Sequence, residues 1–214
     1  MAKALPDEPT KWDVELKIDG VAVSIFYENG VLVRGVTRGN GVVGDDITHN
    51  VRVVHDVPKK LNAKHPPAVV ELRGEIYMRN ADLARINEKR VAAGEEAYAN
   101  TRNVAAGAIR LLDPKIAKSR DLRFFVHGLG YSEGFAPKSH YEYLEQARKW
   151  GFVTTPLVEA PTDFEAAVAR CDALIERLHE LEFEVDGLVL KVDDYGQRER
   201  LGNTTKSPAL GRRL

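Results

Sequence analysis

The chain has 214 residues, a net charge of -1 and 29% charged residues. This is an ordinary globular composition, and it provides no overall basic field for nucleic acid. The single cysteine, Cys171, excludes an intrachain disulfide and argues against a zinc site. No apolar run reaches membrane-spanning length and the first ten residues lack a hydrophobic signal core, so a reducing cytoplasm is the expected compartment.

The beginning of the chain predicts antiparallel β structure. Residues 12–17 alternate between apolar and polar, which indicates a half-buried strand with Lys17 on its polar face. Asp19-Gly20 is turn chemistry, and Asn29-Gly30 is the strongest short hairpin signal. The strands on either side of that hairpin are expected at residues 21–27 and 31–37. The pattern therefore predicts an antiparallel meander with the lysine near a turn.

Strands and helices are mixed in the rest of the chain. Asn80 is placed to cap a helix. An alanine-rich helix at 101–112 is expected to stop at Asp113-Pro114. Further strands are expected at 69–78, 122–131 and 185–192. Further helices are expected at 140–150, where Gly151 ends the helix, and at 163–181. No closing element is expected at the end of the chain.

The helix at 163–181 carries a clear 3.6-residue apolar stripe. Cys171 falls on this stripe, so we interpret it as a core residue and not as a reactive thiol. Because the strands and helices do not follow a strict βαβ rhythm, the sequence favours an α+β fold built on antiparallel sheet.

Lys17 is either an ordinary solvated charge or a nucleophile. A strand lysine on a polar face is most often a solvated charge, but Lys17 shares its face with Glu15 and is followed by Asp19-Gly20. A similar combination recurs at Asp186-Gly187 and Lys191. A lysine nucleophile must lose its proton, and the ordinary lysine pKa is about 10.4. Desolvation or a nearby cation favours the neutral amine, whose attack on phosphorus would give a covalent lysine–nucleotide.

The run from Gly39 to Gly44 fits the pattern G-x-G-x-x-G. A dinucleotide-binding unit would also need a following helix and an acidic residue about twenty positions further on. Here Asp45-Asp46 follows directly, which puts negative charge where a pyrophosphate would lie. The sequence therefore excludes a Rossmann unit at this position.

Two other charged segments can be interpreted either as purely structural or as part of a ligand-binding site. Arg73 and Glu75 lie on one face of a strand, as an ion pair or with the carboxylate accepting hydrogen bonds from a ribose. Arg102 and Arg110 are eight residues apart, which leaves them about 80° apart around a helix. They are either solvated arginines of a buried helix or ligands for phosphate.

Together these segments resemble the adenylation (nucleotidyltransferase) domain of NAD-dependent bacterial DNA ligase, over roughly residues 10–208. Lys17-Ile18-Asp19-Gly20 matches the K-x-D-G motif, which ATP-dependent ligases and capping enzymes share. The more specific matches are residues 37–48, 72–75, 100–107 and 186–191.

The resemblance implies a covalent nucleotidyltransferase fold, with antiparallel sheets flanked by helices. It implies that Lys17 attacks NAD and keeps AMP, with magnesium assisting and no residue assigned as a metal ligand. AMP then passes to the 5′-phosphate of nicked double-stranded DNA, and the strand is sealed in replication and repair by a monomeric enzyme. The other implied roles are adenine contact for Glu15, ribose contact for Glu75, adenylate contact for Lys191, pocket organisation for Asp19 and Asp186, and phosphate or DNA contact for Arg38, Arg102 and Arg110.

The chain departs from the family pattern in residues and in extent. Asn40 stands where aspartate is common, Ala108 where serine is usual and His127 where a tyrosine stacks on adenine. The family places a helical nicotinamide-mononucleotide-binding domain before this one and OB-fold, zinc-finger and helix-hairpin-helix regions after it. Residues 1–214 are therefore expected to be the adenylation domain alone. Two alternatives remain: a truncated fragment that only binds nucleotide or DNA, and a nucleotidyltransferase that uses ATP or GTP.

Overall fold

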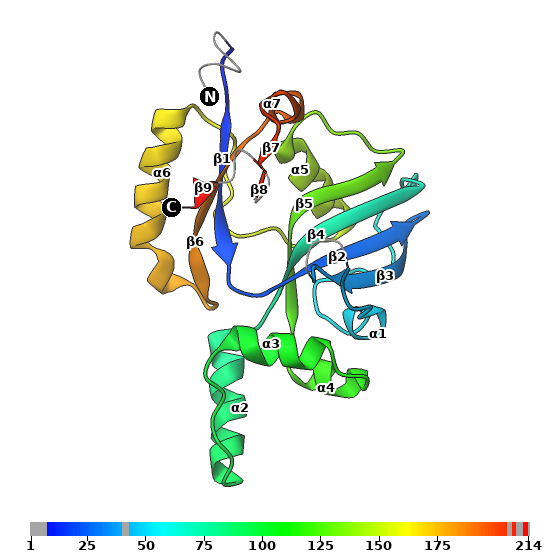
Figure 1. Cartoon of the computed structure of the whole chain (residues 1–214), viewed down its shortest axis with the longest axis vertical. Coiled ribbons are helices and arrows are strands. Elements are labelled where there is room, and N and C mark those ends of the chain that lie inside the picture. Colours follow the sequence, from blue (N-terminus) through cyan, green and yellow to red (C-terminus); the bar gives the residue numbers. More distant parts are fainter. Residues whose placement is uncertain (1–7, 40–42, 205–206, 209–211, 214) are drawn as a thin grey trace.

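The computed structural model describes residues 8–39, 43–204, 207–208 and 212–213, so Asn40 and the centre of the glycine run lie outside the described residues. Two antiparallel sheets dominate (Figure 1), ordered β1-β6-β9 and β3-β2-β4-β5. The α+β fold expected from the sequence is confirmed. The strands are β1 (Trp12–Ile18), β2 (Val21–Glu28), β3 (Val31–Thr37), β4 (Val69–Tyr77), β5 (Arg123–Glu133), β6 (Val185–Val192), β7 (Asn203–Thr204), β8 (Ser207–Pro208) and β9 (Arg212–Arg213).

Helices cover the outer faces of the sheets. Helix α6 packs on β1 and β6, α5 packs on β5, and α3 packs on β2 and β4. The helices are α1 (Thr48–Val51), α2 (Asn80–Ala92), α3 (Thr101–Ile109), α4 (Pro114–Ser119), α5 (His140–Trp150), α6 (Phe164–Glu176) and α7 (Tyr195–Leu201), with a 3₁₀ turn η1 at Leu178–Glu180. Among the described residues, none of these helices has both the length and the apolar character that crossing a membrane requires.

The predicted meander is wrong at its first step. The β2–β3 hairpin is confirmed, with Asn29 and Gly30 at φ 48° and 78° as a type I′ turn requires. However, β1 pairs with β6 and not with β2. Asp19 and Gly20 carry the chain from one sheet to the other. At Gly20 a Cβ would lie 2.5 Å from the carbonyl oxygen of Ile76, so the crossing needs a glycine.

The prediction that β1 is half-buried is also wrong, because both of its faces are covered. Asp13 and Glu15, on the polar face, are 0% and 2% exposed. The apolar face packs against α6, where Trp12 meets the ring of Phe164 edge-on. On the polar face, His140 of α5 contacts Glu15. Alternation of polar and apolar residues therefore located the strand, but it did not distinguish water from a buried polar network.

Two hydrophobic cores hold the sheets together. The larger core fills the space between the four-stranded sheet and helices α1, α3, α4 and α5. The smaller core lies between β1, β6 and α6 and contains Cys171, whose predicted burial is confirmed. Tyr77 of β4 and Phe125 of β5 also belong to it, stacked with ring centroids 4.4 Å apart and edge-on to Phe183. The smaller core therefore includes side chains from both sheets.

Three predictions about element ends need correction. Asn80 begins α2 but does not cap it, because Arg79 occupies the cap position without a side-chain hydrogen bond. Asp113-Pro114 does not stop α3, which ends at Ile109. Instead Asp113 caps α4, its carboxylate accepting the Lys115 N–H at 2.9 Å with proline in the first turn. The chain also has closing elements, α7 and the short β9 whose backbone pairs with β6.

The helix over residues 140–150 is confirmed with its closing glycine. Gly151 has φ 102°, the left-handed conformation that ends many helices. At the other end, the Ser139 side chain accepts the Glu142 N–H at 3.1 Å. Both ends of α5 are thus fixed, and its first residue, His140, lies against β1.

Candidate active site

The two sheets meet around Lys17, near the end of β1. Its ammonium pairs with the carboxylate of Asp186 on the neighbouring strand β6. The Lys17 side chain is 26% exposed, so it is shielded from water but still reachable from outside. Both residues have a glycine near them in the sequence: Gly20 is three positions after Lys17, and Gly187 follows Asp186 directly.

On the four-stranded sheet, Glu75 faces the same site. Burial raises its pKa to about 7, although the positive charges of Arg102, Lys17 and Arg38 oppose this shift. Its Oε2 is buried and has no hydrogen-bond partner among the described residues. Such an oxygen is costly to bury unless a donor arrives from outside the protein. Glu75 is therefore a candidate acceptor for a ligand hydroxyl.

Asp19 and Arg102 form the third contact of the site, with Nη1 of Arg102 3.1 Å from Oδ1 of Asp19. Asp19 follows the strand that carries Lys17, while Arg102 lies in the first turn of α3. The arginine is about half exposed, so its charge faces both the site and the solvent. This arrangement suits a cation that contacts a phosphate.

Behind Lys17, Glu15 is bound to Lys191 and His140. Nζ of Lys191 lies 2.9 Å from Oε1 of Glu15, and Nε2 of His140 donates to the same oxygen. Burial alone would raise the pKa of Glu15, but Lys191 and His140 hold it well below its usual range. A carboxylate at 2% exposure thus stays ionised.

His127 lies between Glu75 and Lys191 and contacts both. Its Nε2 is 3.9 Å from Oε1 of Glu75, and its carbonyl oxygen accepts a hydrogen bond from Nζ of Lys191 at 2.8 Å. Burial, together with the charge of Lys191, lowers the pKa of His127 to about 4. The ring is therefore neutral at pH 7 and offers an uncharged aromatic face.

The structure thus brings most of the predicted site residues together. Arg38 is exposed just after β3 and acts on Glu75 through its charge. Arg110 is the exception, because its guanidinium pairs with Asp45 at 3.1 Å, away from these contacts. The alternative ion pair between Arg73 and Glu75 does not form, since Arg73 pairs with Glu71 at 2.8 Å.

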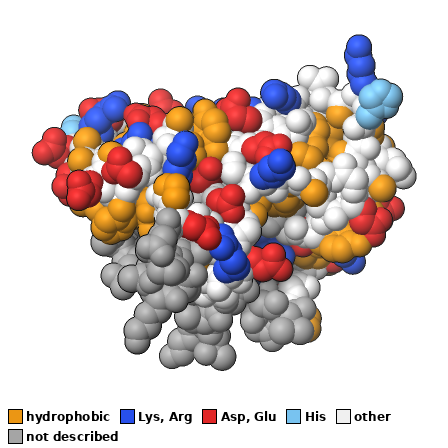
Figure 2. All heavy atoms as spheres, turned by 90° about the horizontal axis from the view of Figure 1, so that it is seen from above, with side chains coloured by type: hydrophobic (Ala, Val, Ile, Leu, Met, Phe, Trp, Pro, Cys, Tyr) orange, Lys and Arg blue, Asp and Glu red, His pale blue; other side chains and the backbone are white. Residues whose placement is uncertain are grey.

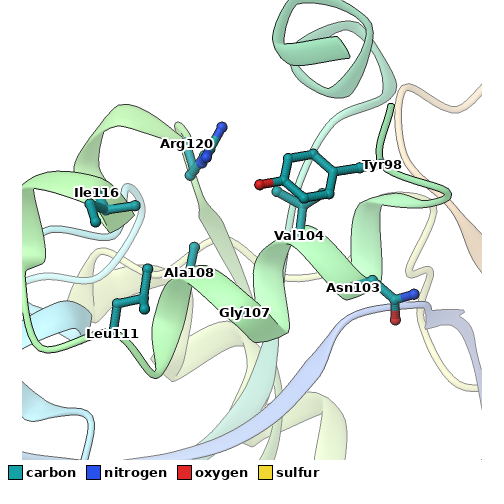
Figure 3. Close-up of a pocket in the computed structure, with 8 residues that line it drawn as sticks. All are labelled: Tyr98, Asn103, Val104, Gly107, Ala108, Leu111, Ile116 and Arg120. Carbon is teal, nitrogen blue, oxygen red and sulfur yellow. The ribbon is translucent and has the colours of Figure 1, made fainter. Parts of the chain in front are cut away.

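Two pockets lie outside this cluster. The first, of about 170 Å³, lies beside α3 and α4, where Arg120 is 5.6 Å from the ring centroid of Tyr98 (Figure 3). The second, of about 350 Å³, is lined by Tyr77, Phe125 and Phe183 together with charged residues. None of the predicted site residues lines either of these two pockets.

The surface charge agrees with the near-zero net charge. On the face seen from above, acidic and basic side chains are interspersed among apolar ones (Figure 2). Among the described side chains of this face, neither sign of charge forms a large patch of its own.

Sequence reasoning missed His140 and Tyr195. His140 is 1% exposed and touches Glu15, and its Nδ1 is 3.4 Å from the hydroxyl of Tyr195. In the sequence, His140 is only the first residue of a helix, more than a hundred positions from Glu15. No local sequence pattern predicts a contact between residues so far apart in the chain.

Gly20→Ala is expected to lower stability by about 1–3 kcal/mol, because the new Cβ would overlap the Ile76 carbonyl, which cannot move without disturbing β4. Urea unfolding would measure the shift. Gly107→Ala in α3 is the matched control. A Cβ there meets nothing within 4 Å, so helix propensity should raise stability by about 0.5–1 kcal/mol. Equal effects in both variants would contradict the close approach at Gly20.

The fold is that of a ligase nucleotidyltransferase domain. An archaeal ATP-dependent RNA ligase of known structure aligns with 90% of this chain and 42% of its own, with a TM-score of 0.52 and 19% identity, which bears on the fold alone. The sequence matches the family described as NAD-dependent DNA ligase adenylation domain over residues 1–211. The chain belongs to this family, as its motifs had indicated.

Curated relatives agree with this family. A DNA ligase of Rhodopirellula baltica is 47% identical over 216 residues, covering 96% of this chain and 31% of the relative. A DNA ligase of Carboxydothermus hydrogenoformans is 45% identical over 204 residues, covering 95% and 30%. The chain therefore spans about 30% of the length of these relatives.

Proposed function

We propose that this chain is the catalytic core of an NAD-dependent DNA ligase and that Lys17 is its nucleophile. The observation that carries the proposal is the meeting of Lys17, Glu75 and Lys191 from three strands at one place, in a chain of this family. Residues 1–214 act in this proposal as one adenylation domain.

The first step is transfer of AMP to Lys17. The lone pair of Nζ attacks the α-phosphorus of NAD, a phosphorus–nitrogen bond forms, and the phosphorus–oxygen bond to nicotinamide mononucleotide breaks. Lys17 gives up protons on becoming a phosphoramidate, and the carboxylate of Asp186, which pairs with the Lys17 ammonium, can accept a proton. Arg102 and Arg38 are placed to balance the charge of the phosphates.

The remaining residues bind the nucleoside. Glu15 contacts the adenine and the neutral ring of His127 stacks on it in place of the usual tyrosine, while Lys191 lies against the adenylate. Glu75 accepts hydrogen bonds from the ribose, which would satisfy its unpartnered Oε2. Asp19 holds Arg102 and so organises the phosphate end of the pocket.

Magnesium fits these residues as a metal brought with the nucleotide. Mg²⁺ is usually bound through one or two carboxylates together with substrate phosphates. Within the part of the chain that the structure describes, no cluster of three or more metal-binding side chains occurs. The nucleotide phosphates would supply most of its ligands, and no residue of the chain is assigned to the ion. When bound, the metal would spread the charge of the phosphoryl group.

The later steps are proposed for the whole protein. AMP passes from Lys17 to the 5′-phosphate of a nick in double-stranded DNA, and the 3′-hydroxyl then attacks and releases AMP. Arg102 and Arg110 would contact phosphates or the nicked DNA. The enzyme acts as a monomer in replication and repair.

Nucleotide dependence tests the proposal. The chain is incubated with magnesium and either NAD or ATP, and its intact mass is measured. An increase of one AMP with NAD and none with ATP is the expected result. Labelling by ATP alone would overturn the NAD dependence, and nucleotide binding without any adduct from NAD would reduce the chain to a binding fragment.

Glu75→Gln should remove a pH dependence of nucleoside binding. Because the Glu75 pKa is about 7, the wild-type carboxylate gains charge as pH rises from about 6 to about 8 and accepts ribose hydrogen bonds more strongly. Adenosine is the ligand for this test, because it has no phosphate that titrates in this range. Calorimetry should show affinity rising with pH in the wild type and staying level in Glu75→Gln. A rise of equal size in both would contradict the ribose contact.

The same substitution should change stability in a defined direction. The folded pKa of Glu75 lies above its ordinary value of 4.5, so its contribution is present at low pH and is lost as pH rises through about 7. Glu75→Gln should therefore raise the unfolding temperature more at about pH 8 than at about pH 5.

A further inference from the structure

His140 is the first residue of α5 and is held firmly against the sheet. Its backbone N–H donates to the carbonyl of Asp193 at 2.9 Å, and the N–H of Tyr195 donates to the carbonyl of Lys138 at 3.0 Å. The ring is 1% exposed and lies between Glu15 on one side and the Tyr195 hydroxyl on the other. The start of α5 is therefore tied to the junction of β6 and α7, and the imidazole cannot turn away freely.

The neighbours of the ring define its tautomer. Burial and the charge of Lys191 lower the pKa of His140 to about 4, so the imidazole is neutral and has one donor and one acceptor. Nε2 faces the ionised carboxylate of Glu15 and therefore carries the proton. Nδ1 then accepts from the hydroxyl of Tyr195, whose pKa burial raises, so the hydroxyl keeps its proton. The 3.3 Å approach of Lys191 Nζ to Nε2 is a contact without a shared proton.

Both donors to Glu15 use the same oxygen. His140 and Lys191 each bind Oε1, so neither bond uses Oε2. Two donors on one oxygen fix the rotation of a carboxylate and leave the second oxygen in a defined direction. Lys191 lies against the adenylate in the proposed function, whereas His140 is buried and contacts Glu15 from the side of α5.

We propose that His140, with its tautomer set by Glu15 and Tyr195 together, is a positioning residue that orients Glu15 to read the 6-amino group of the purine. This inference rests on the proposed function, because it takes Glu15 to be the group at the base. The ligand class is a 6-aminopurine nucleotide, and the property that His140 controls is the preference for that amino group.

Calorimetric binding of two nucleotides tests the proposal, with AMP compared against purine riboside 5′-monophosphate, which lacks the 6-amino group. A hydrogen bond to a charged group corresponds to roughly a tenfold or larger preference for AMP in the wild type. His140→Asn, too short to reach Glu15, should lose about tenfold of that preference while its affinity for purine riboside 5′-monophosphate stays level. His140→Gln should restore the preference, because its amide N–H can replace Nε2–H.

Two tyrosine variants complete the design. Tyr195→Phe removes the donor to Nδ1 and should lower the preference without changing the buried volume of the ring. Tyr143→Phe is the matched control: its hydroxyl donates to the carbonyl of Gly128 at 2.7 Å, so its loss should lower the unfolding temperature but leave the preference unchanged. If His140→Asn does not fold, Tyr195→Phe and His140→Gln carry the test.

The outcomes separate this inference from the proposed function. If Glu15→Gln loses the preference while His140→Asn and Tyr195→Phe keep it, Glu15 reads the base without their help and the positioning role is wrong. If the wild type shows no preference, Glu15 is not at the base, and this inference fails together with the adenine contact assigned to Glu15, while the adduct on Lys17 still tests the proposed function. A parallel loss in Tyr143→Phe would reduce the effect to general destabilisation and also overturn the inference.

Discussion

Lys17→Ala is expected to abolish the covalent AMP adduct that forms when the chain is incubated with NAD and magnesium. Removing the amine removes the atom that bonds to phosphorus, so the loss should be complete and not a reduction in rate. Intact mass spectrometry detects the adduct directly. Because Lys17 is only partly exposed and sits at the meeting of the two sheets, the alanine variant is also checked for folding by thermal unfolding.

A variant that conserves the charge of Lys17 tests whether this residue acts as a nucleophile or only as a cation. Lys17→Arg can keep an ion pair with Asp186, yet a guanidinium stays protonated and cannot attack. It should therefore remain unlabelled while folding normally. Lys118→Ala, at an exposed helix position, serves as the matched lysine control and should be labelled like the wild type. An adduct that persists in Lys17→Ala would place the nucleophile elsewhere and contradict the mechanism.

The motif around Lys17 was predictable because its residues are close in sequence. Lys17, Asp19 and Gly20 carry the family pattern, and local alternation places them at the end of a strand. Their sheet partners were not predictable, since nothing local distinguishes pairing with β2 from pairing with β6. The steric demand at Gly20, set by the carbonyl of Ile76, decides that crossing and appears only in three dimensions.

The buried side of the site was beyond sequence reasoning for a related reason. Period-two alternation assigns Asp13 and Glu15 to a polar face, and such faces usually meet water. Here α5 and α7 cover that face: His140, the first residue of α5, contacts Glu15, and Tyr195, the first residue of α7, contacts His140. The family resemblance supplied roles for Glu15 and Lys191, but it did not supply the histidine that holds them. Long-range polar contacts leave no periodic signal in the chain.

The error at Asp113-Pro114 has a different origin. Aspartate followed by proline stops one helix and starts another with the same chemistry, because both residues favour the first turn and neither continues a preceding helix. The alanine-rich segment before Asp113-Pro114 favours helix, so the sequence predicted one helix that continues to this pair and ends there. In the structure α3 has already ended at Ile109, and the pair begins α4.

Lys191→Met is expected to destabilise the fold by about 3–5 kcal/mol at neutral pH, because it leaves the carboxylate of Glu15 buried without its cation. Methionine has a similar length, so the loss reports mainly on charge. Urea unfolding measures it. The double variant Glu15→Gln/Lys191→Met removes both charges and should recover much of the stability, since no buried ion is left without a partner. A double variant as unstable as the single one would show that Lys191 acts through packing.

The pH dependence of this loss follows from linkage. In the wild type the folded pKa of Glu15 lies below its ordinary value of 4.5, so Glu15 adds stability above about pH 4.5, and this contribution is lost as pH falls toward the folded pKa. Without Lys191, burial dominates and the folded pKa of Glu15 rises. The same change removes a charge that lowers the pKa of His140, so His140 can protonate and replace the missing cation. Both effects favour the variant as pH falls, and the difference from the wild type should therefore shrink between about pH 7 and about pH 5. A difference that stays constant across this range would mean that Glu15 is not the group left unpaired.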